Sequence, residues 1–486
     1  MATDSSRFAA IISHCKEYGF IFPSSEIYDG LGAVYDYGQW GSELKKNIKD
    51  YWWKSMTQMY ENIVGIDAAI FMHPTTWKAS GHVDNFSDPM IDNRDSNKRY
   101  RVDHLIEAKA DELEKAGHAD QADILLKEMD TLLAANDFAG LKKLIENNKI
   151  LCSVSGTGNW TDVREFNLMF STEFGAVSSE EDNTIYLRPE TAQGIFVNFL
   201  NVQKSGRMKI PFGIAQIGKA FRNEIVARQF IFRMREFEQM EMQFFIRPGT
   251  QMQWYEYWKA ERMKWHLGLG IPSSQYRFHD HVKLAHYADA ACDIEYNFPI
   301  GFKEVEGIHS RTDFDLKRHQ EYSKKKMQYF DNDLDENGKP YGNYIPYVIE
   351  TSIGVDRTVM MVLSEAYLEE DLSTADKKDS RVVLKLPPRL APVKLAILPL
   401  VKKDGLPEIA RSIMEECKSG FKCFYEEKDT IGKRYRRMDA IGTPFCITID
   451  HQSKEDHTVT IRQRDSMQQE RIPIAEIKNI VSRSLN

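Results

Sequence analysis

The chain has 486 residues, of which 42% are hydrophobic and 28% charged, and its net charge is −8. That length exceeds what one hydrophobic core normally supports, so two or three domains are expected, and the composition is that of an ordinary soluble globular protein. The longest apolar run, residues 391–401, is too short to span a membrane, and the N-terminus lacks the basic start and apolar middle of a secretory signal. These features exclude a membrane protein and predict a cytoplasmic one.

The net charge and the spacing of the cysteines limit which partners the chain can bind and whether it forms disulfides. A net charge of −8 argues against a general polyanion binder. Residues 392–486, however, hold 17 Lys and Arg against 14 Asp and Glu, a net charge of +3, so the rest of the chain carries −11. A nucleic acid would have to be held by local patches. The six cysteines are scattered without a CxxC pair, which predicts reduced structural thiols.

The first 150 residues contain two predicted helical regions. The segment YDGLGAVYDYGQWGSELKKNIKDYWW predicts a glycine-punctuated loop and strand, then a helix from about Gly41 with Leu44, Ile48 and Trp52 on one stripe. Residues 103–149 are rich in Lys, Glu, Ala and Leu at helical spacing without proline. They predict a helical insertion in a β-rich body, and a charged face there is equally consistent with plain solvated surface.

From residue 167 to 358 strand-like segments dominate. Helices are predicted near 191–202 and 251–267, and Asn337-Gly338 predicts a hairpin. Residues 365–390 are charged and end in Pro387-Pro388, which is typical of a linker. The remaining segment alternates apolar strands with amphipathic helices, which predicts a small α/β domain with a largely parallel sheet.

The stretch FRNEIVARQFIFRMREFEQMEMQFF, residues 221–245, carries the most chemistry. If it ends in a strand, alternation exposes one polar face with a single aromatic ring and leaves the other face mostly apolar. The polar face is Phe237, Gln239, Glu241 and Gln243. Arg222, Arg233 and Arg235 precede it, and arginine suits phosphate oxygens because its planar fork donates two hydrogen bonds. From composition alone, a surface hairpin with ion pairs stays an equal alternative.

This run resembles motif 2 of the class II aminoacyl-tRNA synthetases, an Arg-x-Glu, a loop, then Arg-x-x-x-Phe-x-x-x-Glu. The matching positions are Arg222, Glu224, Arg233, Phe237 and Glu241. The resemblance implies that Arg222 holds the ATP α-phosphate, Glu224 accepts from the adenine amine and Phe237 stacks on the adenine. Arg233 would reach the outer phosphates.

The segment VIETSIGVDRTVMMVL, residues 348–363, resembles motif 3, a strand leading into a helix. Alternation puts Glu350, Ser352 and Gly354 on one face, and Arg357 would cover the other side of the adenine and contact the γ-phosphate. Arg222 and Arg357 are therefore the expected catalytic residues. The expected ATP contacts are Arg222, Asn223, Glu224, Phe232, Arg233, Phe237, Glu304, Val305, Gly354, Asp356 and Arg357.

Further segments resemble the glycyl-tRNA synthetases: SGHVDNFSDP, RYRVDHL, REFNLMF, RPETAQGIFVNF and EGIHSRTDFDL. The resemblance implies that Glu190 binds the glycine ammonium and that Glu241, Glu350 and Ser352 form a small acidic pocket. Steric exclusion of a larger side chain is the better route to selectivity, because an apolar pocket discriminates one methyl group by only about 1–3 kcal/mol. The expected glycine contacts are Arg101, Glu190, Phe237, Glu238, Gln239, Met240, Glu241, Arg311, Glu350, Ser352 and Gly354.

The resemblance also implies partners and a fold. The segment around Gly41 is similar to motif 1, which builds a homodimer interface, although Gln39-Trp40 stands where the family usually has proline. Some relatives carry a zinc knuckle built from cysteine pairs, but here Cys152 stands alone and no structural zinc is expected. Mg²⁺ is expected to bind with ATP.

The C-terminal run DTIGKRYRRMDAIGTPFCITID resembles an anticodon-binding domain. Basic groups around an aromatic ring suit unpaired RNA bases and phosphates, whereas a basic cluster by itself is more often solvated surface. The expected tRNA contacts are Lys433, Arg434, Tyr435, Arg436 and Arg437.

The predicted fold is therefore α+β. It consists of a class II antiparallel sheet with flanking helices and a helical insertion, followed by the small α/β domain. The predicted divisions are residues 1–100 with motif 1, 101–150 for the insertion, 151–380 for motifs 2 and 3, and 391–486 for anticodon binding.

The predicted activity is ATP-dependent activation of glycine and its transfer to tRNA(Gly). A prolyl, threonyl or histidyl synthetase would lack RPETAQG and the acidic pocket, and a catalytically inactive nucleic-acid-binding relative would not need Arg222, Glu224 and Arg357. An unrelated ATP-dependent ligase should show a GxxxxGKS loop, which this sequence lacks.

Overall fold

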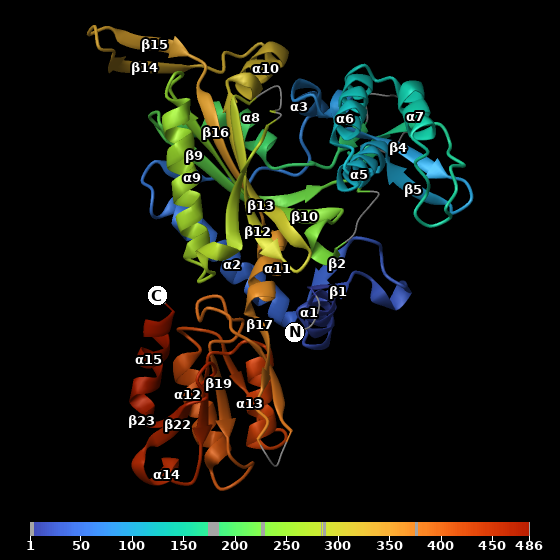
Figure 1. Ribbon diagram of the computed structural model, residues 1–486. Helices are drawn as coiled ribbons and strands as arrows, with labels where there is room; N and C mark the ends of the chain where they lie inside the picture. Colours follow the sequence, from blue (N-terminus) through green and yellow to red (C-terminus); the bar gives the residue numbers. More distant parts are fainter. Residues whose placement is uncertain are drawn as a thin grey trace.

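The computed structural model describes residues 4–173, 184–224, 229–282, 284, 288–374 and 378–485. Figure 1 shows a larger upper body built on a long sheet and a smaller lower body made by the C-terminal residues. The upper sheet is antiparallel except for its edge strand β3, which runs parallel to β9. In spatial order its strands are β11 (Tyr276–Asp280), β12 (Ala290–Phe298), β13 (Gly301–Thr312), β16 (Tyr347–Gly354), β10 (Glu236–Ile246), β9 (Phe212–Phe221) and β3 (Ile63–Gly65).

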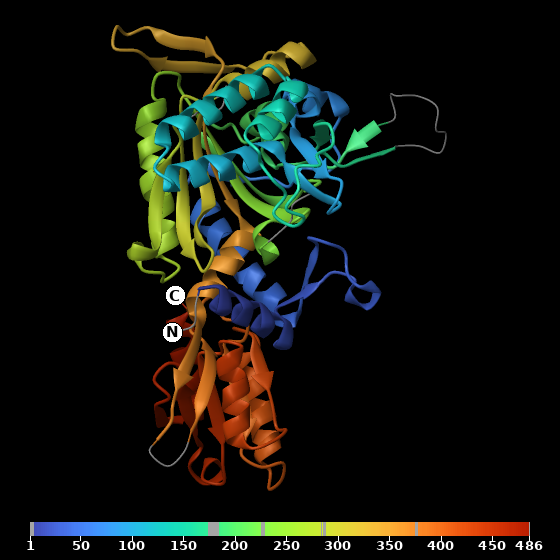
Figure 2. The same ribbon diagram turned by 45° about the vertical axis from the view of Figure 1, so that its right-hand side comes forward.

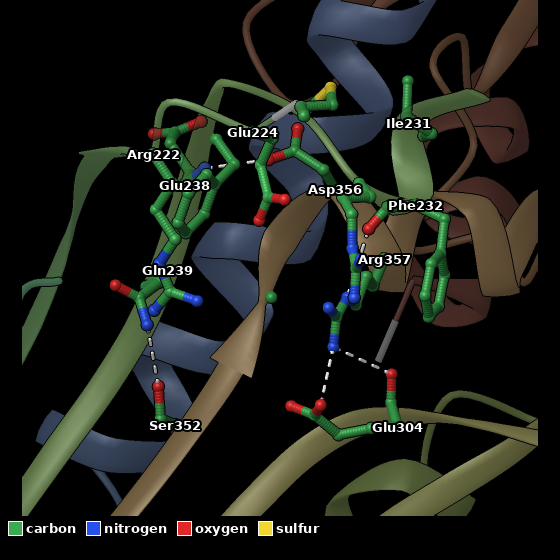
Figure 3. Close-up of a pocket in the computed structure, with 14 residues that line it drawn as sticks. Arg222, Glu224, Ile231, Phe232, Glu238, Gln239, Glu304, Ser352, Asp356 and Arg357 are labelled. Carbon is green, nitrogen blue, oxygen red and sulfur yellow. Dashed lines mark hydrogen bonds and ion pairs between the residues drawn. The ribbon is translucent and has the colours of Figure 1, made fainter. Parts of the chain in front are cut away.

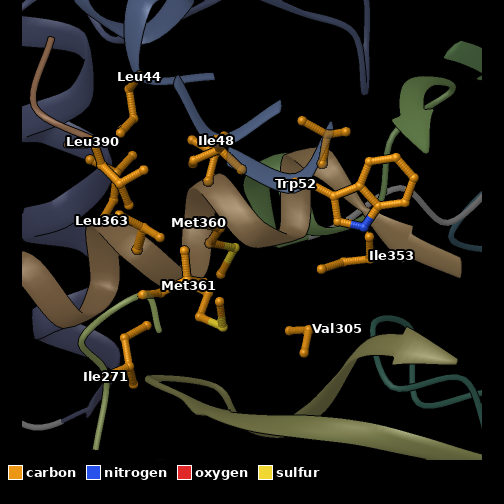
Figure 4. Close-up of a cluster of buried hydrophobic side chains, with 14 of the residues drawn as sticks. Leu44, Ile48, Trp52, Ile271, Val305, Ile353, Met360, Met361, Leu363 and Leu390 are labelled. Atoms are coloured by element: carbon orange, nitrogen blue, oxygen red, sulfur yellow. The ribbon is translucent and has the colours of Figure 1, made fainter. Parts of the chain in front are cut away.

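One face of this sheet is covered by α2 (Gln39–Thr57), α9 (Gln251–Leu267) and α11 (Val355–Ala366). The predicted stripe of Leu44, Ile48 and Trp52 is confirmed, since all three side chains are fully buried. Figure 4 shows this stripe facing the methionines of α11. Each buried side chain of this size contributes roughly 1.5–3 kcal/mol, so the stripe holds α2 firmly against the motif 3 helix.

The opposite face carries the polar groups, and α8 (Ala192–Ser205) covers its upper part. Phe196 and Phe199 of α8 pack on Phe212, Ile214 and Phe245 of the sheet. The helices predicted near 191–202 and 251–267 are confirmed by α8 and α9.

Smaller elements surround these layers. These elements are α1 (Asp4–Glu17), β1 (Ile21–Pro23), η1 (Glu26–Tyr28), β2 (Tyr35–Tyr37), α3 (Pro74–Ala79), α4 (His82–Asn85), β7 (Ser171–Glu173), β8 (Thr184–Tyr186), η3 (Phe230–Phe232), η4 (Ser273–Gln275), α10 (Phe314–Ser323), β14 (Tyr329–Leu334) and β15 (Pro340–Tyr344). The hairpin predicted at Asn337-Gly338 is confirmed by β14 and β15, with Gly338 at φ +74°.

The insertion forms a separate layer beside the upper body (Figures 1 and 2). Its three helices, α5 (Val102–Lys115), α6 (Ala119–Ala134) and α7 (Phe138–Asn147), confirm the helical prediction for residues 103–149. They share a hydrophobic core with residues on both sides, from Ile91 to Val163. A sheet that the sequence analysis did not predict completes this body: β4 (Ser87–Asn93), β5 (Lys98–Arg101) and β6 (Arg164–Asn167).

Two predictions for the C-terminal third are wrong. The expected linker 365–390 contains an antiparallel hairpin, β17 (Tyr367–Asp371) with β18 (Ser380–Leu384), and β18 packs on α13. The C-terminal sheet is mixed and not largely parallel, because its last two strands return as antiparallel neighbours. Its elements are β19 (Leu395–Pro399), α12 (Leu406–Cys417), β20 (Cys423–Tyr425), α13 (Ile431–Ala440), β21 (Phe445–Ile449), α14 (Ser453–Asp456), β22 (Thr458–Gln463), β23 (Gln469–Pro473), η5 (Ile474–Glu476) and α15 (Ile477–Ser484).

All six cysteines are free and buried, which confirms that they are structural thiols. Within the described ranges, none of the helices combines the length and the apolar character that crossing a membrane requires.

Candidate active site

Strand register brings the predicted polar residues into rows across the sheet. Gln239 of β10 lies opposite Gly354 of β16, Glu241 opposite Ser352, and Gln243 opposite Glu350. Residues directly opposite each other on antiparallel strands point to the same face, so these side chains form one continuous polar surface. The predicted alternation is therefore confirmed for both strands.

At the lower end of this surface lies a cavity lined by arginines and aromatic rings (Figure 3). The guanidinium of Arg222 lies 5.3 Å from the Phe237 ring centre, and that of Arg357 lies 4.5 Å from the Phe232 ring centre. The lining residues are Arg222, Glu224, Ile231, Phe232, Arg233, Met234, Phe237, Glu238, Gln239, Glu304, Ser352, Gly354, Asp356 and Arg357. Two guanidinium groups facing flat rings make this cavity suited to a ligand that is both anionic and planar.

Arg357 is oriented from two sides. Its Nε donates to the Phe232 carbonyl at 3.2 Å, and its Nη1 lies 3.0 Å from a carboxylate oxygen of Glu304. Arg357 is also the main reason that the pKa of the Glu304 carboxyl is lowered. Arg222 is held from the other wall, where its Nε donates to the Pro189 carbonyl at 3.1 Å.

Next to this cavity, Glu350 lies at the centre of a buried polar cluster. Its carboxylate accepts from Gln243 at 2.6 Å and from Arg311 at 2.9 Å, and His309 Nδ1 lies 2.9 Å away. Burial opposes ionisation, but Arg311, His309 and Gln243 together lower the pKa of Glu350. Arg311 also donates to Asp315, so one guanidinium is shared between two carboxylates.

Glu241 and Glu190 provide the other two carboxylates of the cluster. Glu241 accepts from the Thr191 hydroxyl and from Gln243, and burial beside Glu350 and Glu190 raises its pKa well above the usual range. Glu190 accepts from Gln193 at 3.0 Å and lies 3.4 Å from His82. Burial opposes the ionisation of Glu190, whereas His82 and Arg311 favour it and lower its pKa to about 2.

Gln239 connects the cavity to the acidic cluster. Its amide nitrogen donates to Ser352 at 3.2 Å, and its carbonyl oxygen accepts from the Thr191 backbone at 3.2 Å. Arg222, Phe237 and Arg357 thus line one cavity together. Glu350 lies in the adjoining cluster, next to the hydrogen-bonded side chains of Gln239 and Ser352, which both line the cavity.

Met240, Val305 and Arg101 do not line the cavity, and Glu238 and Asp356 line it while their carboxylates pair with α2. Met240 and Val305 are buried in the core on the opposite face of the sheet, and Glu238 points to α2, where it pairs with Lys45 and Lys49. The period of two in a strand puts Met240 and Glu238 on the opposite face from Gln239, whereas Val305 is the extra residue where the pairing of β12 with β13 shifts register.

Asp356 and Arg101 are likewise engaged elsewhere. Asp356 lines the cavity, but its carboxylate accepts from Tyr37 and Lys45, so it holds the start of α11. Arg101 lies on β5 of the insertion, 3.1 Å from Asp88 and paired with Asp103.

The predicted tRNA contacts on α13 separate into two kinds. The side chain of Arg434 is buried, and it donates to the carbonyls of Pro399 and Glu426, so this residue is a correction to the predicted basic surface. Lys433 is exposed. Arg436 pairs with Asp379 and Arg437 with Asp429, and the Tyr435 hydroxyl contacts Thr448.

Several residues of the cluster escaped the sequence analysis. They are His82, Thr191, Gln193, Gln243, His309 and Asp315. Alternation had already put Gln243 on the polar face, and continuing it along β13 from Arg311 would have found His309. Thr191 and His82 lie in the quoted segments RPETAQGIFVNF and SGHVDNFSDP, but no periodicity assigns them to the cluster, because Thr191 is the N-cap residue of α8 and His82 begins α4.

The fold and this site define a class II tRNA synthetase. The family model "tRNA synthetase class II core domain (G, H, P, S and T)" matches residues 170–366, "Anticodon binding domain" matches 394–484, and "Glycyl-tRNA synthetase insertion domain 1" matches 88–122 and 116–168. The chain is 50% identical over 477 residues to the glycine--tRNA ligase of Chlorobaculum tepidum, covering 98% of this chain and 99% of that protein. It is 51% identical over 470 residues to the glycine--tRNA ligase of Treponema denticola, covering 96% and 94%. The chain belongs to the glycine--tRNA ligase family.

Proposed function

We propose that the protein activates glycine with ATP and transfers the glycyl group to the 3′ end of tRNA(Gly). The observation that carries this proposal is the adjacency of two sites on one polar surface. A cavity with two guanidinium groups and flat rings adjoins a buried cluster of carboxylates, with Gln239 between them. An anionic nucleotide and a small ammonium compound fit side by side on such a surface.

The cavity supports the nucleotide part of the proposal. Arg222 and Phe237 line one wall and Arg357 the other, so the adenine would stack on Phe237 while the arginines hold the phosphates. Glu224 would accept from the adenine amine, and Arg233 would reach the outer phosphates. Glu304 offers carboxylate oxygens of the kind that Mg²⁺ prefers and would hold the ion that accompanies ATP.

The acidic cluster supports glycine as the amino acid. The lowered pKa values of Glu190 and Glu350 keep both ionised at neutral pH, which suits an ammonium group. Gln239, Ser352 and Glu241 fill the surface around the place where a larger side chain would have to lie. Alanine would therefore be rejected by contact and not by loss of apolar affinity.

Activation needs no side-chain base in this arrangement. The glycine carboxylate is already an anion, and its oxygen attacks the α-phosphorus while the bond from that phosphorus to the bridging oxygen breaks. The products are glycyl-adenylate and pyrophosphate, and the terminal ribose hydroxyl of tRNA then takes the glycyl group. Arg222 and Arg357 would act by positioning ATP and stabilising the developing charge.

The C-terminal body and the N-terminal hairpin support the proposed partners. Lys433, Tyr435, Arg436 and Arg437 would contact the tRNA anticodon, whereas Arg434 would hold the domain together. Ile27 and Tyr28, between β1 and β2, are 86% and 80% exposed and would be covered in a homodimer. A cytoplasmic location accords with this function.

Glycine-dependent exchange of pyrophosphate into ATP tests the activity directly. We expect exchange with glycine and at least about 100-fold less with alanine, proline, threonine or histidine. Exchange with proline or threonine but not glycine would contradict the specificity, and no exchange with any amino acid would point to an inactive relative. Arg357→Ala should abolish exchange and leave tRNA binding largely intact; equal loss of both would make its role structural.

A further inference from the structure

A compact network of buried charges connects α2 with the strand β10 and with the start of α11, which both contribute residues to the cavity. The Nζ of Lys45 lies 2.7 Å from a carboxylate oxygen of Asp356 and 2.8 Å from one of Glu238. Its side chain is 12% exposed, and those of Asp356 and Glu238 are 3% and 13% exposed. Lys45 therefore bridges two carboxylates that come from different elements, β10 and the start of α11.

Asp356 is the centre of this network. One of its oxygens also accepts from the Tyr37 hydroxyl at 2.6 Å, and the other accepts from the backbone N–H of Glu238 at 2.8 Å. The Lys45 ammonium lies 4.2 Å from the centre of the Tyr37 ring, which completes the enclosure of the cation. Asp356 is thus held by three groups from three different elements, β2, α2 and β10, and it holds the motif 2 strand β10 in return.

The charges in the network balance each other. Burial disfavours charge on Lys45, but Asp356 and Glu238 outweigh it and raise the pKa of this amine. Burial likewise disfavours charge on Glu238, whereas Lys45 and Lys49 lower the pKa of that carboxyl. Buried ion pairs persist when each charge is also hydrogen-bonded, and breaking one partner leaves an uncompensated charge.

The position of Asp356 explains why this network concerns catalysis. Arg357 follows it directly and extends into the cavity, where it contacts Phe232 and Glu304 (Figure 3). Glu238 lies between Phe237 and Gln239, which both line the cavity from β10. A shift of Asp356 relative to Glu238 would therefore move Arg357 relative to Phe237.

We propose that Lys45 is a positioning residue for adenylate formation. By bridging Asp356 and Glu238, it sets the spacing between the start of α11, which carries Arg357, and the strand that carries Phe237 and Gln239. Lys45 touches neither nucleotide nor amino acid in this role. The inference rests on the proposed function, because it assigns the residue to the same ATP cavity.

The test uses the full-length protein and three variants. Lys45→Met removes the charge at similar length, Lys45→Arg keeps the charge, and Lys46→Met changes an exposed lysine one position along the same helix. Glycine-dependent pyrophosphate exchange is measured against ATP concentration and against glycine concentration. Thermal unfolding of each variant is followed in parallel.

We expect Lys45→Met to lower kcat/KM for ATP on the order of 100-fold, because misplacement of a catalytic group by about 1 Å costs that much. KM for glycine should change far less, Lys45→Arg should recover most of the loss, and Lys46→Met should match the wild type. If Lys45→Met does not fold, Tyr37→Phe decides, since it removes only the hydroxyl donor to Asp356; a several-fold loss of kcat/KM for ATP is expected.

Two results would overturn the inference. One is a folded Lys45→Met variant with wild-type kcat/KM for ATP. The other is equal loss for ATP and glycine that Lys45→Arg does not recover, which would mean a general structural role. Absence of glycine-dependent exchange in the wild type would contradict the proposed function instead, so the two failures are distinguishable.

Discussion

Two buried charge clusters in this molecule have opposite compositions. In the C-terminal body, the fully buried carboxylate of Asp439 accepts from Arg381 at 2.9 Å and from Arg462 at 2.8 and 2.9 Å. In the acidic cluster of the upper body, one guanidinium, that of Arg311, is shared between Glu350 and Asp315. In the first cluster one carboxylate accepts hydrogen bonds from two guanidinium groups, whereas in the second one guanidinium donates to two carboxylates.

We propose that the difference separates a structural cluster from a binding site. The Asp439 cluster has its charges satisfied within the chain and joins the β17–β18 hairpin to the C-terminal body. The acidic cluster gathers the carboxylates of Glu190, Glu241 and Glu350, and the lowered pKa values of Glu190 and Glu350 keep these two ionised. In the proposed function these two carboxylates would bind the ammonium group of glycine.

The largest effect is expected at the structural cluster. Asp439→Asn should lower the free energy of unfolding of the C-terminal body by about 3–5 kcal/mol, because it leaves buried guanidinium groups without their counter-charge. Urea unfolding measures this loss, and KM for glycine in the folded fraction should stay unchanged. Asp465→Asn, at a 58% exposed partner of Arg464, should change stability by no more than about 0.5 kcal/mol. Equal losses of unfolding free energy in Asp439→Asn and Asp465→Asn would contradict the structural role of the Asp439 cluster.

At the binding cluster the effect should appear in affinity instead. Glu190→Gln should raise KM for glycine by about 10- to 100-fold, since a hydrogen bond to a charged group is worth about 1.5–3 kcal/mol. Some stability should also be lost, because the lowered pKa of Glu190 means that its ionised form stabilises the folded chain, so KM is measured on the folded fraction. Pyrophosphate exchange with Glu236→Gln, at a surface pair with Lys219, serves as the control. A large loss of stability in Glu190→Gln without any change in KM for glycine would mean that Glu190 is structural and does not bind glycine.

Glu241→Gln should have a smaller effect than Glu190→Gln. Burial beside Glu350 and Glu190 raises the pKa of Glu241, so its carboxyl is easier to protonate than that of Glu190 and a neutral glutamine of the same shape should be tolerated better there. We expect KM for glycine to rise less than about fivefold, because the partners Thr191 and Gln243 stay in place. Titration with glycine in the exchange assay compares the two variants, and a larger effect at Glu241 would show that it carries a charge.

The smallest effect is expected in the pH dependence of the unfolding free energy. The pKa of Glu190 falls from an ordinary 4.5 to about 2 on folding, so its contribution to stability is complete above 4.5 and is lost as the pH falls toward 2. In that window the unfolding free energy of the wild type should depend on pH more steeply than that of Glu190→Gln, by at most about one proton. Denaturant unfolding at several pH values measures both slopes, and parallel curves would contradict the lowered pKa.

Much of the site could be predicted because it lies on regular strands. The period of two placed Gln239, Glu241, Glu350 and Ser352 on one face before any fold was known. The same period should have excluded the side chain of Met240, whereas Val305 lies at a register shift of β13 that the sequence does not reveal. Residues contributed by loops and helix starts, such as Thr191 and His82, follow no periodicity and were missed.

Predictions from charge alone were less reliable. Four basic residues on α13 look alike in the sequence, yet Arg434 is buried on backbone carbonyls while Lys433 is exposed. Residues 365–390 look like a charged linker, but Arg381 from this segment pairs with Asp439. The burial of a charge depends on which partner the fold brings close, and sequence spacing does not reveal that.

The amino-acid sequence by itself determined the class II motifs, the amphipathic face of α2 and the alternation along β10 and β16, because these depend on neighbours within one element. Only the tertiary structure decided which charges are shared. It put Arg311 between two carboxylates and Lys45 between Asp356 and Glu238, because contacts between residues of different elements depend on how strands and helices pack.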